Sequence, residues 1–148
     1  MDRVILGASG LKVSPFALGT MTLVIRSSRH IFDLLDLAVE QGINFLDTAN
    51  TYNAGPTEQI IGQWLKARGH REQLVIASKV RYPVGTTPTR LVCPQESSSA
   101  LENSLKRLNT DYLDIYFLHQ PDDEHQSKPP GAASMHCGIR QGPLPGSF

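Results

Sequence analysis

Four side chains of types that exchange protons in enzymes follow strongly apolar segments of this chain. Asp47, Lys79 and His119 each come at or near the end of such a segment, and Tyr52 lies in the loop five residues beyond Asp47. If the segments are parallel strands, their carboxyl ends share one rim, where catalytic groups collect in α/β barrels. The pattern therefore indicates a catalytic site.

Each of these side chains also has a purely structural interpretation. Asp47 could cap a turn, and Tyr52 could be a surface aromatic residue. Lys79 could extend its ammonium group to solvent, and His119 could be an ordinary hydrogen-bonded histidine at a strand end. For any one residue alone the structural interpretation is the stronger. Three successive strands that deliver an aspartate, a lysine and a histidine to one rim nevertheless favour a shared site.

The elements that must position these residues are visible as an alternation of two apolar patterns. From Val13 to His119, short strand-like runs alternate with longer stretches of helical spacing, which is typical of βαβ units around a parallel sheet. A hairpin, Val4–Leu6 with Leu11–Val13, precedes them and is expected to cap the bottom of a barrel. The expected strands are Phe16–Met21, Ile43–Asp47, Leu74–Val80 and Tyr112–His119. The expected helices begin at Ser27 or Ser28 and end at Gly42, begin at Thr57 and end near Gly69, and run from Gln95 to Leu108.

Composition and charge exclude several classes of partner. The 148 residues carry 14 basic and 14 acidic side chains, so no net field steers the chain toward nucleic acid. No apolar run resembles an export signal or is long enough to span a bilayer, so we expect a cytoplasmic protein without membrane insertion. Cys93 and Cys137 lack CxxC partners, which predicts free thiols and no metal site.

The segment around Asp47 and Tyr52 resembles a known signature. Gly42-Ile-Asn-Phe-Leu-Asp47-Thr-Ala-Asn-Thr-Tyr52, followed by Gly55-Pro-Thr-Glu58-Gln-Ile-Ile-Gly62, is similar to the sequence around the catalytic aspartate and tyrosine of the aldo-keto reductases. Further blocks that resemble the family occur in the family's order. They are Gly10–Pro15, Leu18–Met21, Val75–Lys79, Leu105–Leu108 and Thr110–His119, so the resemblance covers roughly Val4 to Asp122.

This resemblance implies a (β/α)₈ TIM barrel and an oxidoreductase that reduces aldehydes or ketones to alcohols with NADPH. Tyr52 would be the general acid that protonates the substrate oxygen as hydride arrives from the nicotinamide. Lys79 would favour the phenolate electrostatically, and Asp47 would hold the lysine in place. His119 would orient the substrate carbonyl.

The resemblance also implies where the cofactor lies. Gly19, Thr20 and Met21 occupy the positions where the family's first strand passes the nicotinamide end of the cofactor, and a glycine there permits close backbone approach. Asp47, at the end of the second strand, is also expected to contact the cofactor. Ordinary barrel packing is an equally valid role for the first three. The chain has no GxGxxG after a strand, so no Rossmann site is indicated, and aldo-keto reductases lack that fingerprint.

Only half of such a barrel is visible in the sequence. An eight-unit barrel takes about 250 residues, whereas four βα units can begin here, so we expect residues 1–123 to form the N-terminal half of the barrel. Residues 124–148 are rich in proline and glycine, and we expect a disordered tail with neither helix nor strand. The first and fourth strands would then both be open edges, which predicts self-association unless a partner completes the barrel.

Three hypotheses remain open at this point. The first is a carbonyl reductase whose activity in this truncated form the sequence does not decide, because the family's later strands supply most of the contacts to the cofactor. The second is a non-catalytic half-barrel binding module, or a regulatory protein like the potassium-channel β-subunits, which share the fold. The third is a chain without a stable fold. Neither the substrate nor a choice of NADPH over NADH can be read from the residues.

Overall fold

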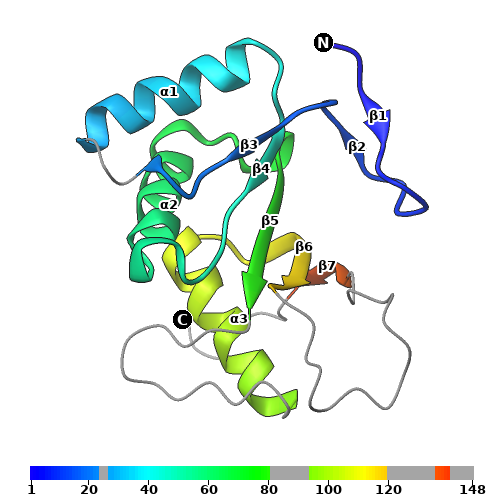
Figure 1. The fold of residues 1–148 in the computed structure, drawn as a ribbon, viewed down its shortest axis with the longest axis vertical. Coiled ribbons are helices and arrows are strands. Elements are labelled where there is room, and N and C mark those ends of the chain that lie inside the picture. The colour runs from blue at the N-terminus through cyan, green and yellow to red at the C-terminus, as the bar shows by residue number, and fades with distance from the viewer. Residues whose placement is uncertain (24–26, 81–93, 120–135, 141–148) are drawn as a thin grey trace, which may run out of the picture.

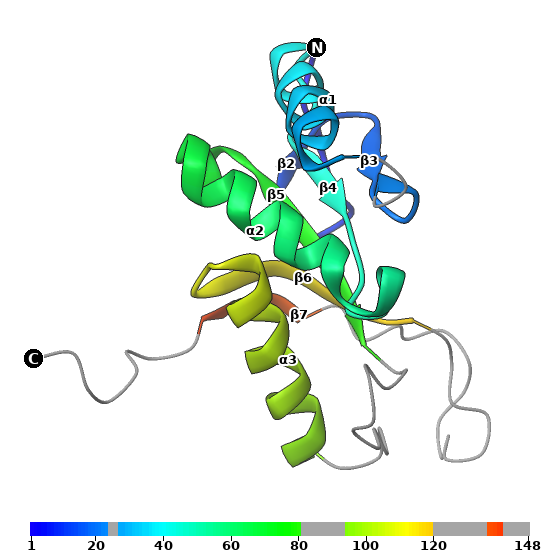
Figure 2. The ribbon, with the colours of Figure 1, turned by 90° about the vertical axis from the view of Figure 1, so that its left-hand side faces the viewer.

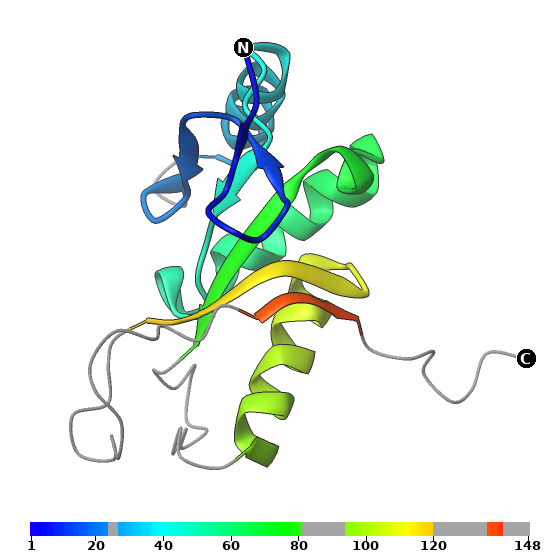
Figure 3. The same cartoon turned by 90° about the vertical axis from the view of Figure 1, so that its right-hand side faces the viewer.

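The computed structural model describes residues 1–23, 27–80, 94–119 and 136–140, with the backbone alone described for 94–98 and 136–140. A twisted sheet has three helices on one face and a two-stranded hairpin on the other (Figures 1 and 3). The elements in chain order are β1 (Val4–Ile5), β2 (Lys12–Val13), β3 (Ala17–Gly19), α1 (Ser28–Glu40), β4 (Phe45–Asp47), the 3₁₀ turn η2 (Tyr52–Ala54), α2 (Pro56–Arg68), the 3₁₀ turn η3 (Arg71–Gln73), β5 (Val75–Val80), α3 (Pro94–Leu108), β6 (Tyr112–Leu118) and β7 (His136–Arg140).

The main sheet has the strand order β3-β4-β5-β6-β7, and its first four strands are parallel. Its register places Gly19 beside Asp47, Asp47 beside Ala77, and Lys79 beside Phe117. Because side chains alternate along a strand, Asp47, Ala77 and Lys79 all lie on the same face, away from the helices. The four strands that the sequence predicts are confirmed, in the predicted order.

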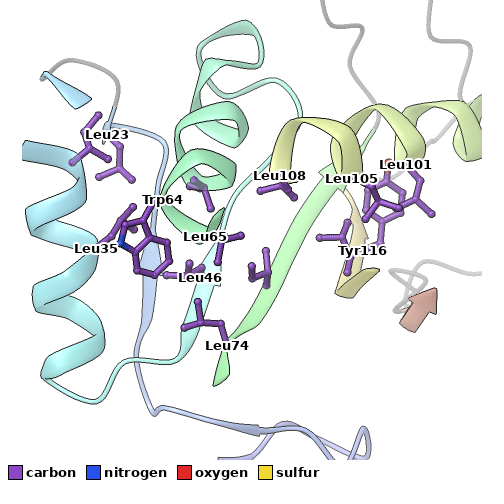
Figure 4. Close-up of a cluster of buried hydrophobic side chains, with 14 of the residues drawn as sticks. Leu23, Leu35, Leu46, Trp64, Leu65, Leu74, Leu101, Leu105, Leu108 and Tyr116 are labelled. Atoms are coloured by element: carbon purple, nitrogen blue, oxygen red, sulfur yellow. The ribbon is translucent and has the colours of Figure 1, made fainter. Parts of the chain in front are cut away.

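Helices α1, α2 and α3 lie on one side of the sheet (Figure 2). The larger hydrophobic core lies between them and the sheet (Figure 4). Trp64 of α2 is fully buried beside Leu35 of α1, and its indole Nε1 donates a hydrogen bond of 2.7 Å to Asp36 Oδ1. Burying an aliphatic or aromatic side chain of this size stabilises a fold by about 1.5–3 kcal/mol. The core also contains Leu46, Ile61, Leu65, Leu74, Ile76, Leu105, Leu108 and Leu113.

Helices α2 and α3 cross in close contact at Gly62. A Cβ atom built on Gly62 would lie 2.2 Å from the carbonyl oxygen of Arg107 and 2.9 Å from the Cα of Leu108. No side chain fits at that separation without movement of the backbone. Glycine is therefore required at this helix position, although glycine normally weakens a helix.

The predicted hairpin is present as β1 and β2, and it packs on the opposite face of the sheet. Val13 is buried against Val75, Ala77 and Ile115, which form a second, smaller core. A reciprocal pair of bonds fastens the hairpin to the start of β4: Asn44 Oδ1 accepts from the backbone N–H of Ser14 at 2.7 Å, and Ser14 Oγ accepts from Asn44 N–H at 3.2 Å. The hairpin thus closes the amino-terminal end of the strands, opposite the rim that carries Asp47 and Lys79.

One predicted helix start is confirmed and another is wrong. Ser27 is the N-cap of α1, as predicted. The prediction that Thr57 caps the second helix is wrong: the N-cap is Gly55, whose φ of 107° suits glycine, and Pro56 occupies the first turn, where its fixed φ is compatible with a helix. The Thr57 hydroxyl instead accepts a hydrogen bond from Asn53 Nδ2 at 3.0 Å.

The sequence predicts no strand in 124–148, and the structure differs at β7. This strand pairs antiparallel with β6, with Leu113 beside Ile139 and Ile115 beside Cys137. An edge strand offers a row of unpaired N–H and C=O groups, and these can pair with a segment that lacks clear apolar periodicity. The prediction of an open edge at β6 is therefore wrong, whereas β3 has β4 as its single neighbour among the described strands. The boundary at 123 and most of the predicted tail lie outside the described residues.

Candidate active site

The structure brings Asp47, Tyr52 and Lys79 together at the carboxyl ends of β4 and β5. Lys79 Nζ lies 2.6 Å from Asp47 Oδ1, 3.0 Å from Tyr52 Oη and 3.0 Å from the carbonyl oxygen of Thr48. The Lys79 and Asp47 side chains are 15% and 33% exposed, so the ion pair is screened only partly by solvent. An ammonium group with three N–H donors thus has three oxygen acceptors around it.

His119, directly after β6, completes the cluster. Its ring meets the ring of Tyr52 edge to face, with centroids 5.9 Å apart, and its backbone N–H donates to the carbonyl of Val80 at 2.8 Å. Burial lowers the pKa of His119, and the positive charge of Lys79 lowers it further, while Asp47 acts in the opposite direction. The imidazole is therefore neutral at pH 7, and such a ring can donate one hydrogen bond and accept another.

The loop between β4 and η2 is held against β5 by its own backbone. The N–H of Thr48 donates to the carbonyl of Ala77 at 2.9 Å, and the N–H of Asn50 donates to the carbonyl of Lys79 at 3.2 Å. These bonds extend the pairing of β4 with β5 past the end of β4. These backbone bonds hold the loop beside β5, so Tyr52 lies within hydrogen-bond distance of Lys79.

A left-handed turn aims the tyrosine. Asn53 and Ala54 have φ values of 55° and 61°, a conformation that costs free energy for residues other than glycine. Asn53 Nδ2 offsets this cost by donating to the carbonyl of Met21 and to Thr57 Oγ1, both at 3.0 Å. The turn that carries Tyr52 is thereby fastened to the loop after β3.

The three residues expected near a cofactor differ in their surroundings. A Cβ on Gly19 would meet nothing within 4 Å, so open space lies over the glycine next to Asp47. Met21 is 61% exposed. Thr20 is fully buried, and both its N–H and its hydroxyl lie 3.0 Å from the carbonyl oxygen of Asp47, to which they donate. Thr20 is thus a packing residue that holds the backbone of Asp47, whereas Gly19 borders open space and the side chain of Met21 is exposed.

Sequence reasoning missed the contributions of the backbone to this site. The backbone carbonyl of Thr48 is the third oxygen that accepts a hydrogen bond from Lys79. Every residue has such a carbonyl, so the residue type at position 48 could not predict this contact. It also missed the side chain of Asn53. The backbone of Asn53 is left-handed, a conformation that asparagine adopts more readily than most residues, so an asparagine in this loop was the signal that could have indicated the turn. Within the described ranges, no group of three His, Cys, Asp or Glu side chains could hold a metal ion, and no helix there is long and apolar enough to cross a bilayer.

The strands, helices and rim residues described above are those of part of a parallel α/β barrel with polar side chains at its carboxyl rim. The model of the "Aldo/keto reductase family" matches residues 15–142, and the chain belongs to that family. Both the resemblance and the fold class predicted from the sequence, the N-terminal part of a (β/α)₈ barrel, are confirmed.

Relatives and solved structures agree with this assignment. The chain is 41% identical over 133 residues to the "Uncharacterized oxidoreductase YrpG" of Bacillus subtilis, covering 82% of this chain and 41% of that protein. It is 33% identical to the "Aryl-alcohol dehydrogenase [NADP(+)]" of Phanerodontia chrysosporium, over 74% of this chain and 34% of that protein. The holo form of an aldo-keto reductase from Bacillus halodurans superposes with a TM-score of 0.72 at 36% identity, over 84% of this chain and 42% of that one. The chain thus spans less than half the length of each.

Proposed function

We propose that this chain reduces aldehydes or ketones to alcohols with NADPH, and that Tyr52 is the proton donor. The observation that carries the proposal is the phenol of Tyr52 held 3.0 Å from the ammonium of Lys79, which is itself paired with Asp47 at 2.6 Å. A phenol gives up its proton more readily when a positive charge stands ready to stabilise the phenolate. Membership of a family of oxidoreductases supports the reaction class.

The residues divide the proton chemistry between them. Tyr52 Oη gives its proton to the carbonyl oxygen as the carbonyl carbon becomes tetrahedral, and solvent later restores that proton. Lys79 stabilises the phenolate left behind, and Asp47 keeps the ammonium in position. His119, neutral near pH 7, can orient the carbonyl by a hydrogen bond without adding a second positive charge. A bound nicotinamide cofactor supplies the hydride.

Two features of the rim support the nicotinamide end of that cofactor binding there. Gly19 leaves open space beside Asp47, and Met21 presents an exposed apolar side chain next to it. A glycine permits a flat ring to approach the backbone closely, and an exposed apolar side chain favours contact with such a ring. The NADP(+) in the name of the Phanerodontia relative favours NADPH over NADH. The cytoplasmic location stays a prediction.

A titration of NADPH into the purified chain tests this proposal, with cofactor fluorescence as the signal. Lys79→Met removes the ammonium but keeps a side chain of similar length, and Lys66→Met removes a lysine on α2, outside the cluster, as the matched control. We expect saturable binding that Lys79→Met weakens and Lys66→Met leaves intact. Absence of binding at millimolar NADPH would contradict the proposal.

A second candidate is a half-barrel binding module without catalysis. It is favoured by the edge of β3, which pairs on one side only among the described strands, and by the exposed apolar side chains of Phe16, just before β3, and Leu37 on α1. A complementary half-barrel would cover both features. Saturable NADPH binding without any reduction of benzaldehyde would favour this candidate over the reductase.

A further inference from the structure

Glu58 is a buried carboxylate for which the proposed reaction has no use. It lies in the first turn of α2, six residues beyond Tyr52, and its side chain is fully buried. A carboxylate is stable in such a place only when hydrogen bonds and an opposite charge compensate for the water it has lost. The partners of Glu58 therefore indicate what the carboxylate does.

Two partners from different elements hold this carboxylate. Arg107 Nε of α3 donates to Glu58 Oε2 at 2.7 Å, and Ser78 Oγ of β5 donates to Glu58 Oε1 at 2.6 Å. Arg107 also donates to Ser104 Oγ at 3.0 Å, within α3 itself. The carboxylate thus connects α2 to both a neighbouring helix and the sheet.

The bond to Ser78 connects the two elements that carry the reacting pair. Ser78 directly precedes Lys79 in β5, and because side chains alternate along a strand, Ser78 faces the helices while Lys79 faces the site. Tyr52 lies in η2, which leads directly into α2. The bond from Ser78 to Glu58 therefore ties the strand of the lysine to the helix that follows the tyrosine, from the buried side of the sheet.

We propose that Glu58 and Ser78 are positioning residues that keep Tyr52 Oη within hydrogen-bond reach of Lys79 Nζ. The effect on turnover rests on the proposed function, whereas the effect on geometry does not. Arg107 holds the carboxylate by charge, so removal of the Ser78 hydroxyl breaks the link to β5 and still leaves Glu58 with its ionic partner.

The test compares Ser78→Ala with Ser104→Ala in the full chain. Both serines are fully buried and both belong to the same hydrogen-bonded network, but the bond of Ser104 stays within α3. With ¹³C-labelled tyrosine and lysine, the Tyr52 Cζ and Lys79 Cε resonances report the contact between the two groups without any cofactor. We expect Ser78→Ala to move both resonances, Ser104→Ala to leave them in place, and Ser78→Thr, which keeps the hydroxyl, to match the wild type.

Turnover gives a second measurement where reduction is detectable. We expect Ser78→Ala to lower kcat on the order of tenfold, because small displacements of a reacting group are costly, with KM for aldehyde within about twofold. Absence of reduction by the wild type would overturn the proposed function alone, and the resonances would still decide this proposal.

Two results would overturn the positioning role. One is a folded Ser78→Ala protein with unchanged Tyr52 and Lys79 resonances; the other is an equal change in Ser104→Ala, which would show that any loss from the network loosens the site. If Ser78→Ala does not fold, Ser78→Cys replaces it, since a thiol of similar size is only a weak donor. Unchanged resonances in that variant would overturn the proposal equally.

Discussion

At the scale of the residue, His119 has its charge state set by its neighbours. Partial burial and the ammonium of Lys79 both disfavour the imidazolium, and the carboxylate of Asp47 offsets them only in part. The folded chain consequently takes up this proton at a lower pH than the unfolded chain, whose histidine has a pKa of about 6.5. Folding and the protonation of His119 are therefore in competition.

This competition predicts a dependence of stability on pH. The contribution of His119 to the free energy of unfolding is fully present above about pH 6.5, the pKa of histidine in the unfolded chain. It is lost as the pH falls toward the lower pKa of the folded state, because the unfolded chain then binds more protons than the folded chain. Urea unfolding of the wild type and of His119→Gln, at pH 7.5 and pH 5.5, measures it. We expect the wild type to lose more free energy of unfolding than the variant; equal losses would contradict the account.

Four residues of the site could be predicted from the sequence, whereas the role of a fifth could not. Tyr52, Lys79, Asp47 and His119 could be selected because strand ends and a motif marked them, and the structure brings them together, although their catalytic roles stay predictions. Thr20 could not be assigned, because a threonine at a strand end can face a ligand or the backbone equally well. Its role depends on a single hydrogen-bond partner, the carbonyl of Asp47.

At the scale of the element, the contact between α2 and α3 depends on Gly62. Replacing an exposed helix glycine with alanine normally stabilises a protein by about 0.5–1 kcal/mol. At Gly62 the new Cβ would overlap the carbonyl of Arg107, and overpacking of this kind costs about 1–3 kcal/mol.

We therefore predict that Gly62→Ala lowers the free energy of unfolding, with the sign opposite to that of an ordinary helix glycine. Urea denaturation followed by circular dichroism measures the change, and Gln63→Ala, the adjacent and exposed position on α2, is the control that should have little effect. A Gly62→Ala protein as stable as the wild type would contradict the prediction, because it would mean that α2 and α3 can move apart to accept the new Cβ without loss of stability.

Element types were more predictable than element ends. Apolar periodicity depends on which face meets the core, so it located three helices and four parallel strands correctly. The start of α2 was misplaced because Gly55 and Pro56 together outweigh the capping tendency of Thr57. β7 was missed because its strand conformation depends on pairing with β6 and not on an apolar pattern of its own.

At the scale of the whole molecule, the described sheet ends at β3 with an unpaired edge. Phe16, just before this strand, is 68% exposed, and Leu37 on the outer side of α1 is 51% exposed. Open strand edges and exposed apolar side chains are typical sites of association between chains. The chain spans less than half the length of the two relatives and of the solved structure.

We predict that the isolated chain self-associates through this edge. Sedimentation velocity should show species larger than a monomer of 16.3 kDa, and Phe16→Asp with Leu37→Glu should shift the distribution toward the monomer. Lys66→Glu, which adds negative charge on α2, is the matched control and should leave it unchanged. A monomeric wild type at high micromolar concentration would contradict this prediction.

The most direct test of the central claim follows hydride and proton together. The chain is incubated with benzaldehyde and NADPH that carries deuterium at the nicotinamide C4, and benzyl alcohol is analysed by mass spectrometry. We predict deuterium on the alcohol carbon. Tyr52→Phe should lower the rate of reduction on the order of 10²–10⁴-fold. Tyr112→Phe, at the amino-terminal end of β6 and away from the site, should leave the rate unchanged. Deuterated alcohol formed equally by Tyr52→Phe, or none formed by the wild type, would contradict the account.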